Sequence, residues 1–157
     1  MQPQNVQLSV RQKEILRFLE KRSKKRVVYA ADVSFDEVSR MFNMTRQGMT
    51  KHFQTLKKEG FVRVGRGFVD LCEKGKRYTE ARDTLFYILK VSPERKSEII
   101  AAIRNLKFRK GEIGEEGNEV FLQIDPEYAS DFLKYLEAFE GVVGIYVVNT
   151  EKKESGS

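Results

Sequence analysis

The spacing of apolar residues changes along this chain, and each change predicts a different kind of element. In the first half, apolar residues recur every three or four positions in three segments, which predicts helices over residues 8–22, 34–43 and 46–59. Short apolar runs at 61–64 and 68–71 then flank the turn Gly65-Arg66-Gly67, which predicts a β-hairpin. The first half is therefore expected to be helical and to end in a hairpin.

Capping residues mark the ends of the second and third helices. Ser34 is followed three residues later by Glu37, the pattern of a capping box, and Asn43 tolerates left-handed backbone at the other end. Thr45 is placed to cap the third helix and Gly60 to end it. The residues expected in the core are Phe35, Val38, Met41 and Phe42 of the second helix, and Met49, Phe53 and Leu56 of the third.

The second half predicts the element order β-α-β-β-α-β. Helices are expected after Ser92-Pro93-Glu94 and after Asp125-Pro126-Glu127, because proline suits the first turn of a helix. The strands are expected at 84–91, at 106–113 and 118–124 around the turn Gly114-Glu115-Glu116-Gly117, and at 144–148. Residues 84–91 also fit a helix, because Ala81, Leu85, Ile88 and Leu89 are spaced for one, so both readings stay open.

These elements predict an α+β protein of two domains. The first, residues 1–80, carries the helices and the hairpin, and the second, residues 81–150, has a ferredoxin-like order. The tail 151–157 is polar and is expected to be disordered.

The net charge of +6 is unevenly shared between the two halves. Residues 1–80 hold 18 Lys and Arg against 9 Asp and Glu, a net +9, whereas residues 81–157 hold 11 against 14, a net −3. The first half is therefore expected to attract a polyanion. A basic face that only contacts water is the alternative.

Several classes of protein are disfavoured by the composition. The longest apolar stretches, 85–89 and 141–148, are too short to span a bilayer, so no membrane contact is expected. A single cysteine, Cys72, cannot form an internal disulfide, which favours the cytoplasm. With one histidine, His52, and no phosphate-binding glycine loop, we expect no enzyme, no metal site and no cofactor. His52 itself either reaches a phosphate or packs between helix and hairpin.

Residues 33–78 resemble the winged helix-turn-helix of MarR, ArsR and DtxR-type regulators. The resemblance is carried by the helix Ser34–Phe42, the short turn Asn43-Met44, the stretch from Thr45 to Val62, and Leu71-Cys72-Glu73-Lys74-Gly75, which is similar to the Leu-Thr-x-x-Gly phrase after the wing. It implies a sequence-specific DNA-binding transcriptional regulator, with recognition helix 46–59 in the major groove and wing 61–71 on the minor groove or the backbone. The contacts it implies are Thr45, Arg46, Gln47, Thr50 and Lys51.

The residue types agree with that reading. If the apolar face of the third helix points inward, the side chains that point outward are Arg46, Gln47, Thr50, Lys51 and Gln54. Arginine pairs with guanine, glutamine with adenine, and threonine contacts a thymine methyl. Arg66 at the bare hairpin tip and Arg63 before it suit a minor groove or its phosphates. For Arg63, contact with water alone is equally open. Lys24, Lys25 and Arg26 either touch the flanking DNA backbone or contact only water.

The second half resembles the effector domain of Lrp/AsnC-type regulators, in element order only. This implies a homodimer that binds double-stranded DNA, with a small-molecule effector held between subunits. Gly141 and Gly144 would permit close backbone approach, or simply begin a strand. Two other functions stay open: a winged-helix module that binds a protein or an RNA, and a chromatin-type protein that coats DNA without sequence preference.

Overall fold

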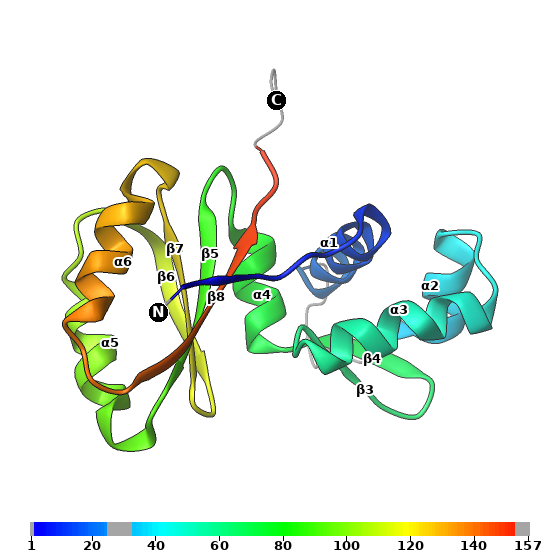
Figure 1. The fold of residues 1–157 in the computed structure, drawn as a ribbon. Helices are drawn as coiled ribbons and strands as arrows, with labels where there is room; N and C mark the ends of the chain where they lie inside the picture. The colour runs from blue at the N-terminus through cyan, green and yellow to red at the C-terminus, as the bar shows by residue number, and fades with distance from the viewer. Residues whose placement is uncertain (1, 25–32, 153–157) are drawn as a thin grey trace. The chain divides into compact units, whose positions relative to one another are not determined.

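The structure, a computed structural model, describes residues 2–24 and 33–152, which form two compact units (Figure 1). One unit is Leu8–Thr79, and the other joins Met1–Gln7 to Glu80–Ser157. The first residues belong with the second unit because β1 (Gln4–Asn5) pairs in parallel with β8 (Val142–Asn149). A domain boundary drawn only at residue 80 therefore misses this N-terminal strand.

The Leu8–Thr79 unit begins with α1 (Val10–Lys24), which starts with a reciprocal cap. The Gln12 N–H donates to Ser9 Oγ (3.1 Å), and the Ser9 N–H donates to Gln12 Oε1 (3.0 Å). The apolar face of α1 buries Ile15, Leu16 and Leu19. Val10 had the spacing of that face but is 74% exposed, because it lies in the first turn on the solvent side.

Helix α2 (Phe35–Met41) and helix α3 (Arg46–Lys58) follow, joined by a short turn. Ser34 caps α2 as predicted, with its Oγ accepting from the Glu37 N–H at 3.1 Å. The Glu37 carboxylate does not complete the box; it pairs with Arg22 at 2.8 Å. Asn43 has the expected left-handed backbone, at φ 50°.

Met41 was expected in the core, and that prediction is wrong. Its side chain is 61% exposed at the end of α2. The next residue, Phe42, turns toward α1, where its ring meets Phe18 edge-on at 5.9 Å. Phe42 therefore covers α1 at this end of α2, and the side chain of Met41 points to solvent.

A small antiparallel sheet completes the helical unit. The predicted hairpin is β3 (Val62–Val64) with β4 (Phe68–Leu71), and β2 (Val33–Ser34) adds to the free edge of β4. Helix α4 (Glu73–Glu80) follows and was not predicted. It packs so closely on the residue before β3 that only glycine fits at position 75: a Cβ at Gly75 would lie 2.3 Å from the Phe61 carbonyl oxygen.

The second unit has the predicted β-α-β-β-α-β order. Its elements are β5 (Leu85–Val91), the 3-10 turn η1 (Pro93–Arg95), α5 (Lys96–Arg104), β6 (Arg109–Glu116), β7 (Glu119–Ile124), η2 (Pro126–Tyr128), α6 (Ala129–Glu137) and β8. The sheet order is β1-β8-β5-β7-β6. Residues 85–91 are thus a strand. The sequence was ambiguous there because this strand pairs on both sides and is buried on both faces, so its apolar residues do not alternate.

Helices α5 and α6 lie together on one face of the sheet (Figure 1). Their apolar residues, including Ile103 and Leu136, meet Leu89 and Leu122 from the strands. Phe132 of α6 also packs edge-on against Tyr87 at 4.8 Å. This cluster is the hydrophobic core of the second unit.

Two details of the second unit differ from the prediction, and a third decides between its alternatives. The β6–β7 turn is Gly117-Asn118, and Gly114, Glu115 and Glu116, expected in the turn, belong to β6 and pair with β7. Gly117 supplies the positive φ, 57°, that a two-residue turn needs. Gly141 does approach another segment closely, but within the same unit, where its Cβ would lie 2.6 Å from Arg95 Cβ. Glu151 is not disordered, because its carbonyl accepts from the Asp83 N–H at 3.0 Å.

Some expectations fall outside the described residues. Lys25 and Arg26 are among them, and so is the end of the tail, residues 153–157. Within the described ranges, every helix is too short or too polar to cross a membrane.

Candidate nucleic-acid interface

Helix α3 is fixed at both ends by the residues that the sequence singled out. Thr45 Oγ1 accepts from the Gly48 N–H at 3.1 Å, which satisfies one of the free donors of the first turn. At the other end, the Gly60 N–H donates to the Lys57 carbonyl and the Phe61 N–H to the Leu56 carbonyl, at 3.0 and 2.9 Å. This pair of bonds, with Gly60 at φ 82°, is a Schellman motif.

The inner face of α3 sets how the helix is rotated about its own axis. Met49, Phe53 and Leu56 are all at most 2% exposed, as predicted. Phe53 also stacks on Phe35 of α2, with ring centroids 4.9 Å apart. A helix held in this way along one face has its opposite face fixed as well.

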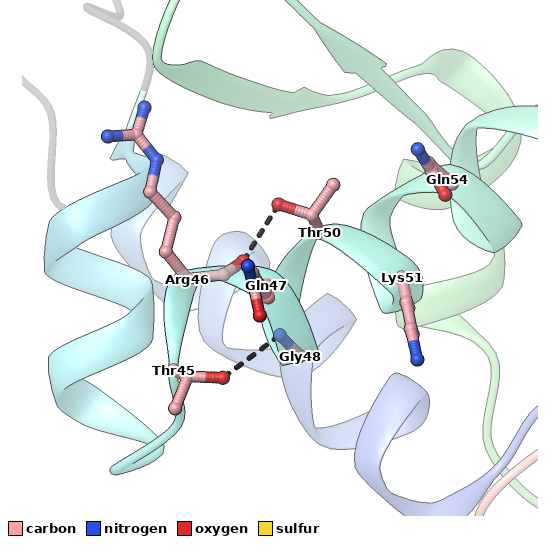
Figure 2. Close-up of a pocket in the computed structure, with 7 residues that line it drawn as sticks. All are labelled: Thr45, Arg46, Gln47, Gly48, Thr50, Lys51 and Gln54. Atoms are coloured by element: carbon pink, nitrogen blue, oxygen red, sulfur yellow. Dashed lines mark hydrogen bonds between the residues drawn. The ribbon is translucent and has the colours of Figure 1, made fainter.

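The outer face of α3 gathers all of the predicted helix residues on one surface (Figure 2). With Gly48 between them, they line an open depression of about 710 Å³. Their side chains are exposed except that of Thr50, which is half-buried. The residues concerned are Thr45, Arg46, Gln47, Thr50, Lys51 and Gln54.

Among the described residues, the polar ends of four of these side chains have no partner. Within the described residues, no hydrogen bond or ion pair involves the side chains of Arg46, Gln47, Lys51 and Gln54. Exposed arginines elsewhere in this unit, such as Arg22 and Arg63, do pair with carboxylates. The outer face of α3 therefore presents hydrogen-bond donors and acceptors that a ligand could use, and two of the side chains, Arg46 and Lys51, are positively charged.

The two threonines of this surface each make one bond within the helix. The Thr50 hydroxyl donates to the Arg46 carbonyl at 2.7 Å, which leaves its oxygen to accept and its methyl group to make apolar contact (Figure 2). Thr45 Oγ1 accepts a bond as the cap, which leaves its hydroxyl proton free to donate. Thr45 can thus bond to an anion, and Thr50 can contact a base edge or a methyl group.

The hairpin tip has open space at both of its glycines. A Cβ added at Gly65 or at Gly67 would meet nothing within 4 Å. The Phe35 N–H donates to the Gly67 carbonyl at 2.8 Å, so the tip is tied to the first residue of α2. Arg66 between the two glycines is exposed and, among the described residues, has no ion-pair partner.

Arg63, the other predicted hairpin residue, is in a different electrostatic setting. It lies directly across the strand pair from Asp70, and its guanidinium is 3.0 Å from the Asp70 carboxylate. Its side chain is 70% exposed, so it can still reach a phosphate, but part of its charge is compensated. The hairpin therefore presents one free cation and one paired cation.

Other candidate residues add little chemistry. His52 and Cys72 are both half-buried, and the Cys72 carbonyl accepts from the Lys76 N–H at 3.0 Å, as the start of α4. In the described part of the chain, no group of three or more His, Cys, Asp and Glu side chains could hold a metal ion. Sequence reasoning missed Phe68 and Lys74, because an apolar residue in a strand and a lysine after a hairpin have no distinguishing spacing.

Comparison with known proteins gives similarity to solved structures only. No family model and no curated protein matches the sequence. A transcriptional regulatory protein of the AsnC family from Pyrococcus furiosus is 13% identical over 96% of this chain and 94% of its own, with a TM-score of 0.36. LrpC of Bacillus subtilis is 15% identical over 96% of this chain and 100% of its own, with a TM-score of 0.33.

A transcriptional regulator of Neisseria meningitidis, solved in complex with L-methionine, is similar to the same degree. It is 15% identical over 96% of each chain, with a TM-score of 0.34. Because these TM-scores are all below 0.5, the function proposed below rests on this chain's own residues.

Proposed function

We propose that this protein is a sequence-specific DNA-binding transcriptional regulator whose Leu8–Thr79 unit acts as a winged helix-turn-helix. Helix α3 is the recognition helix in the major groove, and the β3–β4 hairpin is the wing. The observation that carries the proposal is the outer face of α3: free polar side chains on a helix whose opposite face is buried and whose ends are both capped.

The dimensions of α3 suit a major groove. Its 13 residues make a rod about 20 Å long at 1.5 Å per residue. A major groove about 12 Å wide admits a helix of this kind, side chains included. The outward side chains extend from Arg46 to Gln54, so they can follow several base pairs along the groove floor.

Each side chain of this face supports a distinct role. Arg46 can bond to guanine O6 and N7, and Gln47 and Gln54 to adenine N6 and N7. Thr50 offers its methyl group to thymine, since its hydroxyl proton is used within the helix. Lys51 and the Thr45 hydroxyl are suited to phosphates, which fix the register of the helix.

The wing supplies contacts that do not depend on sequence. Arg66 is exposed between two glycines that leave open space beside it, so it can enter a minor groove or lie along its phosphates. The charge of Arg63 is partly neutralised by Asp70, so Arg63 contributes less to DNA affinity than Arg66 does. The net +9 of residues 1–80 draws the whole unit to the duplex.

We further propose that the protein works as a homodimer in the cytoplasm. One short helix offers few base contacts, and a second half-site about 34–36 Å away multiplies a weak affinity. The second unit, with its own sheet and core, is the part that we assign to dimerisation and to a small-molecule effector. No catalytic role is assigned to any residue.

The proposal is tested by selecting binders from random-sequence duplex DNA with the purified protein, followed by a salt titration. We expect a two-fold symmetric motif and an affinity that falls steeply with salt on every duplex. Tight binding with no motif would mean a chromatin-type coating protein. No duplex binding at low salt would contradict DNA binding, and would favour a module that binds a protein or an RNA.

A further inference from the structure

An aromatic ring stands exposed beside the tip of the β3–β4 hairpin. Phe68, the first residue of β4, is 45% exposed. Covering this ring with a partner would be favourable, because an exposed apolar side chain forgoes the free energy of burial. No other aromatic residue of the described Leu8–Thr79 unit is as exposed.

The direction of the Phe68 side chain follows from the strand itself. Val69 and Leu71 are each 1% exposed and point into the core, so Phe68 and Asp70 point to the opposite face. Asp70 on that face holds Arg63. The ring of Phe68 stacks on no other ring among the described residues, and 45% of the residue's surface stays exposed.

The backbone around the ring is held in place. The Gly65 N–H donates to the Phe68 carbonyl at 2.9 Å, which closes the tip, and the Gly67 carbonyl accepts from the Phe35 N–H at 2.8 Å. Phe68 also pairs with Ser34, the cap of α2. A ring on such a support keeps its position when it is pressed against another surface.

The tip therefore carries a free cation and an exposed ring two residues apart. Arg66 is exposed and has no ion-pair partner among the described residues, and the glycines on either side of it have open space where a side chain would lie. The minor groove of DNA attracts arginine by its negative potential. Its walls are apolar deoxyribose, and apolar side chains that enter it can unstack a base step and bend the duplex.

We propose that Phe68 is a DNA contact of the wing that wedges at a base step in the minor groove beside the half-site and bends the duplex there. The inference rests on the proposed function. Its consequence is a preference for a pyrimidine–purine step such as TA under the wing, because those steps unstack most easily. This preference is separate from the bases that α3 reads.

The test uses the full chain and a duplex that carries the selected motif, labelled with a donor and an acceptor dye at its two ends. Energy transfer at saturating protein gives the bend, and titration gives the affinity. The variants are Phe68→Ala, Phe68→Leu, and Tyr128→Ala as a control for loss of an exposed aromatic in the other unit. Thermal unfolding of each variant checks that it is folded.

We expect Phe68→Ala to remove most of the bend and to lower the affinity about tenfold on a duplex with a TA step under the wing. Phe68→Leu keeps part of both, because leucine is also an apolar wedge. Arg46→Ala weakens binding but leaves the bend intact once the duplex is saturated. Tyr128→Ala changes neither.

A bend that is unchanged in Phe68→Ala at saturation overturns the wedge, whatever happens to the affinity. The proposed function would stand in that case, since the wild-type protein would still bind its motif. If the wild-type protein selects no motif, the proposed function itself has failed, and the wedge fails with it. A wild-type complex that binds tightly without any bend also contradicts the wedge.

Discussion

The ammonium group of Lys74 donates a hydrogen bond of 2.7 Å to the carbonyl oxygen of Glu59, joining the start of α4 to the end of α3. Lys74 is only 6% exposed, and its ammonium group also lies 5.7 Å from the centre of the Phe61 ring. The carbonyls of a last helical turn lack partners within the helix, and a cation there is favourable. Lys74 therefore stabilises the C-terminal end of the proposed recognition helix.

Replacing Lys74 by methionine is expected to lower the free energy of unfolding by about 1–3 kcal/mol, because the methionine keeps the bulk but loses a charged hydrogen bond. Lys76→Met is the matched control, since Lys76 lies on the same helix and is exposed. We expect its effect to stay within about 0.5 kcal/mol. Urea unfolding of both variants measures the difference, and equal stabilities would contradict a structural role for Lys74.

Thr45 combines a structural role and a proposed phosphate contact, and two substitutions separate them. Thr45→Ala removes the cap of α3 and is expected to cost about 1 kcal/mol of stability as well as DNA affinity. Thr45→Asp restores the cap but places a carboxylate near the proposed phosphate. Its stability should return to that of the wild type while its affinity falls further.

The outcome against this assignment is also clear. If Thr45→Asp binds DNA as well as the wild-type protein, Thr45 does not lie near a phosphate. Unfolding curves and duplex titrations of the same preparations give both quantities.

Arg66 and Arg63 form a matched pair on the hairpin. Arg66→Ala is expected to lower affinity on all duplexes and to reduce the slope of log affinity against log salt by about 1, the effect of one lost phosphate contact. Arg63→Ala should change the slope less, because Asp70 already neutralises part of its charge. A larger effect for Arg63 than for Arg66 would contradict the arrangement proposed for the wing.

Local signals account for the parts of the structure that could be predicted from the sequence. Helix α3 was predicted nearly to the residue because its apolar period, the cap Thr45 and the terminator Gly60 all agree. The outward residues followed from the buried ones. The same holds for the hairpin, whose glycine-flanked tip separates two short apolar runs.

The parts that were missed depend on distant segments or on atypical buried residues. Strand β1 is two exposed polar residues, and it forms only because β8 lies beside it. Helix α4 buries Tyr78 together with Lys74, Gly75 and Thr79, so most of its buried face carries no apolar signal. Met41 and Phe42 were both expected in the core, but α2 ends at Met41, and of the two only Phe42 packs inward, against Phe18.

The central claim is that Arg46 and Gln47 read bases, and a cycle of protein and base substitutions tests it most directly. Each base pair of the selected motif is changed in turn, and binding is measured for the wild-type protein, Arg46→Ala and Gln47→Ala. We expect each variant to lose discrimination at one position, by about 1–3 kcal/mol, and to keep it elsewhere, with a smaller loss on unrelated duplexes. Equal losses on motif and unrelated duplexes, with discrimination unchanged at every position, would contradict base reading by α3.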